Sequence, residues 1–190
     1  MYTLPTSKQI AHLTRKITEG TVYEFGDSKF SPNMLKYYKA AIPYLMAPKT
    51  PQDIWEELGF TWSTSNKKVD VVLAGNYLEN TMDINNRMKE MWKKGKVGSY
   101  FMFAGPTAVN QGYLALQPNY WLSLINNNDI DVSYFQIGDG RGQHVAVVDS
   151  SKTYRHGTII DLLHKFVETR ELITNITIQK KSTKELVCPQ

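Results

Sequence analysis

Two short apolar stretches, with an amphipathic segment between them, constrain the fold of this chain more than any other feature. The stretches "KVDVVLAG" and "VGSYFMFAG" begin at Lys68 and Val97. The first is apolar at both odd and even positions, which is the pattern of a strand buried on both faces. The segment between them has the period of a helix and ends at a glycine; its apolar stripe is Ile84, Met88, Met91 and Trp92. We therefore predict that Val69–Leu73 and Val97–Phe103 are neighbouring core strands, bridged by a helix from Thr81 to Lys94.

The rest of the chain alternates between helix and strand signals. Thr6-Ser-Lys-Gln9 has the form of a capping box, and the segments at 21–25 and 172–179 alternate like strands, the second half-buried. The apolar runs "DIDVSYFQI" and "HVAVV" flank a glycine-rich connection, which predicts an antiparallel hairpin. These signals predict an α/β (mixed α+β) single domain with a mixed sheet of five to seven strands and packed helices. Within it, we expect an N-terminal helical portion at 1–60, the sheet core at 61–180 and a loose tail at 181–190.

Length and composition limit the class of protein. A chain of 190 residues buries well over half of its surface, so it needs neither a disulfide nor a metal to fold. The single cysteine, Cys188, cannot form an intrachain disulfide. No leader sequence and no membrane-spanning run is visible, so we expect a cytoplasmic protein without a membrane partner. A net charge of +4 favours polyanionic partners without requiring them.

The positive charge is concentrated in "NRMKEMWKKGK", which begins at Asn86 and contains one acid, Glu90. Cations along one helix neutralise phosphates of a nucleic-acid backbone. We therefore take RNA or another polyanion as a candidate partner, bound by Arg87, Lys89, Lys93, Lys94 and Lys96. The alternative is a solvated helix face without a ligand.

The stretch "GQHVAVVDSSKTYRHG", from Gly142 to Gly157, carries two of the four histidines. Thr158 opens a capping box, and the N–H groups of a helix start are a natural anion site. We predict an anion-binding loop made of Arg141, Tyr154, Arg155 and Thr158. Paired imidazoles beside cations are the parts that cleave RNA without a metal, one as base and one as acid. The sequence thus predicts a metal-independent ribonuclease or other phosphate-handling enzyme, with catalytic residues His144, His156 and Lys152.

Two alternatives remain open. The first is a non-catalytic binding or assembly module that recognises a protein partner. The second follows from "QHVAVVDSSKTYRH", which resembles the histidine box of permuted papain-like proteins of the lecithin-retinol acyltransferase type. The resemblance implies a Cys/His hydrolase or acyltransferase, but Cys188 does not open a helix as the cysteine of that family does. The histidines lack the spacing of helical zinc ligands and no CxxC is present, so we expect no metal and no cofactor.

Overall fold

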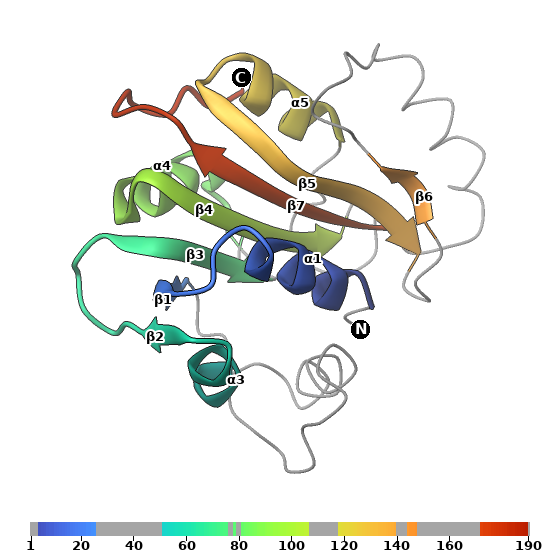
Figure 1. The fold of residues 1–190 in the computed structure, drawn as a ribbon. Coiled ribbons are helices and arrows are strands. Elements are labelled where there is room, and N and C mark those ends of the chain that lie inside the picture. The colour runs from blue at the N-terminus through green and yellow to red at the C-terminus, as the bar shows by residue number, and fades with distance from the viewer. Residues whose placement is uncertain are drawn as a thin grey trace.

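A computed structural model describes residues 4–25, 51–75, 78, 81–106, 118–139, 144–147 and 172–189 of the chain. Its strands form one seven-stranded sheet in the order β2-β1-β3-β4-β7-β5-β6 (Figure 1). The described helices are α1 (Leu4–Thr14), α3 (Pro51–Glu57), α4 (Ile84–Lys94) and α5 (Pro118–Asn126). This architecture confirms the predicted mixed α/β fold.

Four neighbouring strands are parallel. They are β1 (Gly20–Glu24), β2 (Phe60–Trp62), β3 (Val69–Gly75) and β4 (Gly95–Pro106). The helix α4 connects β3 to β4, and the buried side chains of this helix include Met88 and Trp92. The predicted strand–helix–strand unit is therefore confirmed, although Val97 itself is exposed.

The other half of the sheet is antiparallel. The strand β7 (Leu172–Lys180) lies between β4 and β5 (Ile130–Asp139) and runs opposite to both. The last strand, β6 (His144–Val147), pairs antiparallel with β5 at the sheet margin, as the hairpin prediction required.

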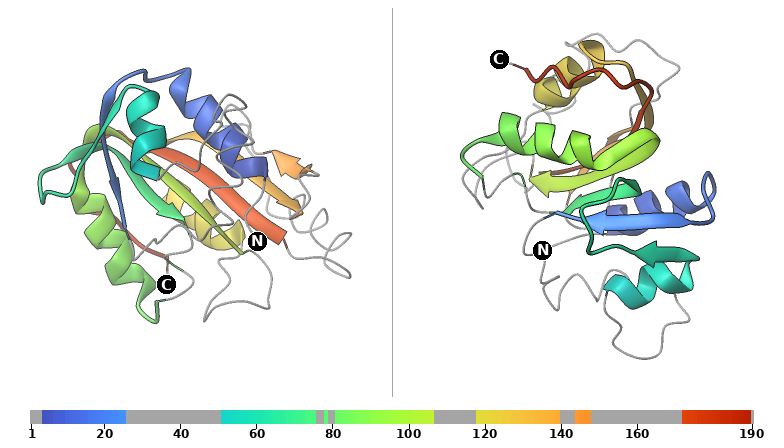
Figure 2. Two further views of the ribbon diagram at one scale, coloured as in Figure 1. Left: turned by 90° about the horizontal axis from the view of Figure 1, so that it is seen from below. Right: turned by 90° about the vertical axis from the view of Figure 1, so that its left-hand side faces the viewer.

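Helices cover both faces of the sheet (Figure 2). Helices α4 and α5 lie on one face, and α1 and α3 lie on the other. Neighbouring residues along a strand point to opposite faces, so Phe101 and Phe103 pack under α4 and α5 while Met102 packs under α1 and α3. The residues within 1–60 that the structure describes thus share a core with those beyond residue 60.

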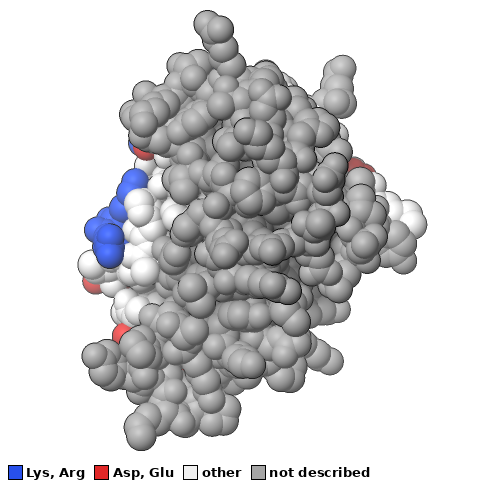
Figure 3. All heavy atoms as spheres, turned by 90° about the vertical axis from the view of Figure 1, so that its right-hand side faces the viewer, with Lys and Arg blue, Asp and Glu red and all other residues white. Residues whose placement is uncertain are grey.

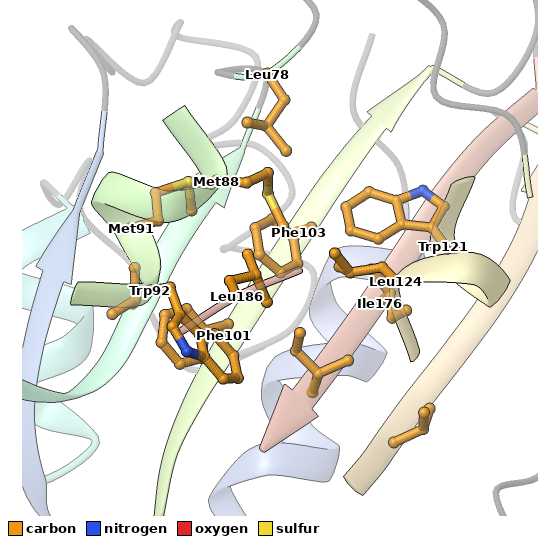
Figure 4. Close-up of a cluster of buried hydrophobic side chains, with 14 of the residues drawn as sticks. Leu78, Met88, Met91, Trp92, Phe101, Phe103, Trp121, Leu124, Ile176 and Leu186 are labelled. Atoms are coloured by element: carbon orange, nitrogen blue, oxygen red, sulfur yellow. The ribbon is translucent and has the colours of Figure 1, made fainter. Parts of the chain in front are cut away.

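The larger core cluster centres on aromatic contacts between helices and strands (Figure 4). The rings of Trp92 and Phe101 stack with centroids 5.0 Å apart, and those of Phe103 and Trp121 meet at the same separation. Leu186, from the segment after β7, fills the space beside them and is buried. The central strands, α4, α5 and the C-terminal segment therefore share this cluster.

Residues 181–189, expected to be loose, make specific contacts. The Trp92 indole donates to the Lys184 carbonyl at 3.0 Å, and the Asn128 side chain both donates to and accepts from the Val187 backbone at 2.8 Å. The polar composition of this segment concealed its one anchoring apolar residue, Leu186. Among the described residues, no helix is long and apolar enough to cross a membrane.

Replacing Gly95 with alanine is expected to cost about 1–3 kcal/mol of unfolding free energy, the usual cost of overpacking a core. Its backbone angles suit any residue, but an added Cβ would overlap the ring of Phe101. Denaturant unfolding of Gly95→Ala, Phe101→Leu and the double variant measures the coupling. The double variant is expected to lose less than the sum of the two single losses. Additive losses would contradict an overlap with this ring.

Candidate functional site

The order of the parallel strands reverses between β1 and β3. The chain passes from β1 to β2 on one side, and then returns to β3 on the other side of β1. In open α/β sheets, ligands bind outside the carboxyl ends of the strands at such a reversal. We call the carboxyl ends of these two strands, with Glu24, Phe25, Ala74 and Gly75, the β1/β3 edge.

The β1/β3 edge is held together by its backbone. Glu24 pairs with Leu73, and beyond the last residue of β1 the Phe25 N–H donates to the Leu73 carbonyl at 2.9 Å. The side chain of Glu24 is half-buried at this edge. Gly75 pairs with Ala104 on β4, and the next residue of β4 is Gly105. Small residues at strand ends leave room for a ligand to approach the backbone.

The opposite, amino edge of the same strands carries a polar network. The Asp70 carboxylate accepts from the Thr21 N–H and hydroxyl, each at 2.9 Å, and lies 2.5 Å from Lys96 Nζ. Burial alone would raise the pKa of Asp70, but the hydrogen bonds from Lys96 and Thr21 and the Lys96 charge lower it below its usual value. This network joins β1, β3 and β4 at the end remote from the β1/β3 edge.

The five cations predicted to bind nucleic acid do not form one free surface. Arg87 pairs with Glu90 at 2.7 Å, and Lys96 pairs with Asp70. Lys94 is buried, donates to the Ser65 carbonyl, and places its Nζ 3.6 Å from the centre of the Tyr23 ring. Burial lowers the pKa of Lys94. Lys89 and Lys93 are exposed, and nucleic-acid binding by this segment stays a prediction.

His144 opens β6, at the far margin of the sheet. Four strand spacings separate β3 from β6, so the two strands lie about 19 Å apart across the sheet. Figure 3 faces the β6 side of the molecule and shows described Lys and Arg side chains at one margin only. The other residues of the predicted site lie outside the described residues: Arg141, Lys152, Tyr154, Arg155, His156 and Thr158. Their convergence with His144 therefore stays a prediction.

In the part of the chain that the structure describes, no group of three or more His, Cys, Asp or Glu side chains is placed to hold a metal. Cys188 is half-buried against α4, where its thiol donates to the Asn85 carbonyl at 3.5 Å. Burial raises the pKa of the Cys188 thiol, and the charge of Lys89 offsets this only in part. An activated thiolate needs the opposite shift.

Comparison of the sequence with known protein families and with curated proteins gives no match. Solved structures do match. TehB from Haemophilus influenzae is 10% identical with a TM-score of 0.52, over 92% of this chain and 62% of TehB. The [4+2]-cyclase SpnF is 10% identical with a TM-score of 0.50, over 94% of this chain and 81% of SpnF. A SAM-dependent methyltransferase from Archaeoglobus fulgidus is 13% identical with a TM-score of 0.45, over 93% of each chain.

These matches correct the function expected from the sequence. The prediction of a ribonuclease, phosphate-handling enzyme or hydrolase is wrong, because the solved structures that match the chain include SAM-dependent methyltransferases and a [4+2]-cyclase instead. That prediction relied on the local spacing of two histidines, whereas the strand order directs attention to the opposite half of the sheet. It missed Glu24, which ends β1 two residues before Gly26 in the sequence. The chain has a Rossmann-like fold, which it shares with TehB and SpnF.

Proposed function

We propose that this protein binds S-adenosylmethionine at the β1/β3 edge and acts as a methyltransferase. The observation that carries the proposal is the reversal of strand order between β1 and β3. The methyl donor is proposed because structures named as methyltransferases are among the solved structures that match the chain. SpnF, a [4+2]-cyclase, has a similar fold, so ligand binding is the part of the proposal to test first.

The residues of the β1/β3 edge fit such a ligand. S-adenosylmethionine carries ribose hydroxyls, an ammonium group and a sulfonium. A carboxylate accepts hydrogen bonds from the hydroxyls and the ammonium group, and its negative charge attracts the sulfonium. Among the described carboxyl ends of the parallel strands, Glu24 brings this carboxylate. A dinucleotide site needs three glycines for its pyrophosphate, whereas the sequence after β1 reads Phe25-Gly26-Asp27 with a single glycine. A nucleoside without a pyrophosphate does not need the other two.

The bound group would supply an electrophilic methyl carbon, and the chain supplies binding and orientation. Glu24 would accept hydrogen bonds from the ligand and fix its position relative to the sheet. Gly75 and Gly105 would let the ligand approach the strand ends closely. The Phe25–Leu73 hydrogen bond keeps the ends of β1 and β3 at a fixed separation.

Isothermal titration calorimetry with S-adenosylhomocysteine tests the proposal. Glu24→Gln is expected to weaken binding at least tenfold, because a hydrogen bond to a charged group contributes about 1.5–3 kcal/mol. Glu19→Gln makes the same chemical change at the exposed amino side of β1 and is expected to leave the affinity unchanged. Circular dichroism checks that both variants fold.

A folded wild-type chain that does not bind S-adenosylhomocysteine would contradict the proposed function. Equal affinities for Glu24→Gln and the wild type would contradict the placement of the ligand at this edge.

A further inference from the structure

Helix α1 packs against a polar strip of the sheet. Gln9 is buried, and its side-chain amide donates to the Ile176 carbonyl at 2.8 Å, the Thr177 hydroxyl at 3.0 Å and the Phe103 carbonyl at 3.3 Å. Thr177 pairs with Tyr134 on β5, and the next pair facing the same side is Asn175 with Gln136. The docking of α1 therefore combines polar contacts with the buried apolar residues Ile10 and Leu13.

His12 lies on the same helix and faces a bulge in β5. The pairing of β5 with β7 shifts register between Val132 and Tyr134, and Ser133 is the extra residue. The His12 ring lies 5.7 Å from the Tyr134 ring. Its Nε2 is buried and makes no hydrogen bond within the part of the chain described. A neutral imidazole tolerates this position, but a protonated one would bury a charged N–H without an acceptor.

The charges around His12 also disfavour its protonation. Burial lowers the pKa of His12 below its usual value, the Lys16 charge and then the Arg15 charge lower it further, and the Ser133 backbone opposes them in part. On β5, burial raises the pKa of Tyr134 to about 12, so this side chain is neutral at physiological pH. Asp131 on the same strand faces Lys181 at 3.6 Å.

The other strands that contact α1 bring neutral groups. From β7 these are Thr177 and Asn175, and from β4 it is the Phe103 carbonyl. None of the groups that act on His12 in the described structure is a carboxylate. Only the Ser133 backbone stabilises a charge on the imidazole, and it offsets the other effects in part.

We propose that His12 makes the docking of α1 on β5 and β7 pH-dependent, so that protonation of its imidazole shifts α1 toward an undocked state. The undocked state hydrates the ring and exposes the polar strip of the two strands. Protonation can change the ratio of docked to undocked α1 only within a limit. That limit is about tenfold for each unit by which the pKa of His12 in the docked state lies below its pKa in the undocked state. Acidification therefore weakens α1 docking by degrees and does not unfold the sheet.

The sign follows from linkage. The docked state has the lower pKa, so it binds fewer protons than the free helix as the pH falls below 6.5. The contribution of His12 to the stability of the docked state is fully present above pH 6.5. It is lost as the pH falls through the pKa of His12 in the docked state. Below the docked pKa both states are protonated and no further loss occurs.

Hydrogen exchange measured at about pH 7.5 and about pH 5.5 tests the proposal, with rates corrected for the intrinsic effect of pH. The α1 amides of residues 9–14 are expected to lose protection severalfold at the lower pH. The amides of residues 88–94 in α4 serve as the internal control and are expected to keep theirs. In His12→Gln, whose side chain does not titrate, the α1 amides are expected to show no such loss.

Nuclear magnetic resonance titration of the His12 ring in the wild-type chain gives a second measurement that does not depend on a variant. A His12 pKa at or above 6.5 would overturn the proposal. An equal loss of α1 protection in His12→Gln would also overturn it, because another group would then be responsible. Neither result depends on ligand binding at the β1/β3 edge.

Discussion

Replacing Phe101 with alanine is expected to lower the free energy of unfolding by about 3–5 kcal/mol, a large part of the total stability of a domain. Phe101 lies on β4, where it pairs with Val72 on one side and Ile178 on the other. Its side chain is 1% exposed and stacks on Trp92. Removing the ring leaves a cavity between α4 and the central strands that rigid neighbours cannot fill.

Urea unfolding at a fixed temperature measures this loss. Val97→Ala, on the same strand with its side chain 48% exposed, is the matched control and is expected to change the stability by no more than about 0.5 kcal/mol. An unchanged dependence on urea would confirm that the variant unfolds from the same compact state. Similar losses in the two variants would contradict the central place of Phe101 in the core.

The parallel unit at residues 69–106 was predictable because its signals are local. A strand apolar on both faces, an apolar stripe at helical spacing and a terminating glycine each depend on neighbouring residues only. The helix ends at the predicted Lys94 and begins at Ile84, later than the predicted Thr81. The antiparallel pairing of β5 with β6 was also predictable, because two apolar runs flank a short glycine-rich stretch of the sequence.

The burial of β7 was not predictable from its own pattern. Its alternation indicates a half-buried strand with one polar face, yet Asn175 and Thr177 on that face are buried. The polar face is covered by α1, and Gln9 supplies hydrogen bonds from a position far away in the sequence. Local alternation records the polarity of a face, but not which distant element covers it.

The β1/β3 edge was missed for a related reason. Glu24 stands two residues before Gly26, which is a weak local signal, whereas the histidines of residues 142–157 lie within one conspicuous stretch. Its significance comes from the order of the strands, and no spacing in the sequence encodes that order. The strand order is settled by which faces and edges pack best together, which is a property of the whole sheet.

Replacing Lys180 with methionine is expected to cost about 2–4 kcal/mol of unfolding free energy. Lys180 ends β7 with its side chain buried, and its Nζ donates to the Trp92 carbonyl at 2.9 Å and the Gly95 carbonyl at 3.3 Å. It also lies 4.7 Å from the centre of the Trp92 ring. Both carbonyls belong to the end of α4, where the helix dipole favours a cation. Methionine keeps the apolar stem but leaves two acceptors without this donor, at about 1–3 kcal/mol each.

Lys181→Met is the matched control for this substitution. Lys181 is exposed, donates to the Gln179 side chain at 3.0 Å and lies 3.6 Å from Asp131, so its loss is expected to change the stability by no more than about 0.5 kcal/mol. Urea unfolding of the two variants and the wild type, at the same neutral pH, gives the comparison. Equal losses in the two variants would show that Lys180 does not anchor the end of α4.

The pH dependence separates the charge of Lys180 from its packing. Burial, and next the charge of Lys68, lower the pKa of Lys180 below 10.5, so the unfolded chain holds this proton to a higher pH than the folded chain. The contribution of this group to stability therefore rises as the pH increases from the folded pKa toward 10.5. The methionine variant lacks the group, so the difference in stability between wild type and Lys180→Met is expected to widen over that interval. If the difference in stability narrows over that interval instead, the folded state binds the Lys180 proton more tightly than the unfolded chain does. Lys180 would then have to face a negative charge rather than the two carbonyls at the end of α4.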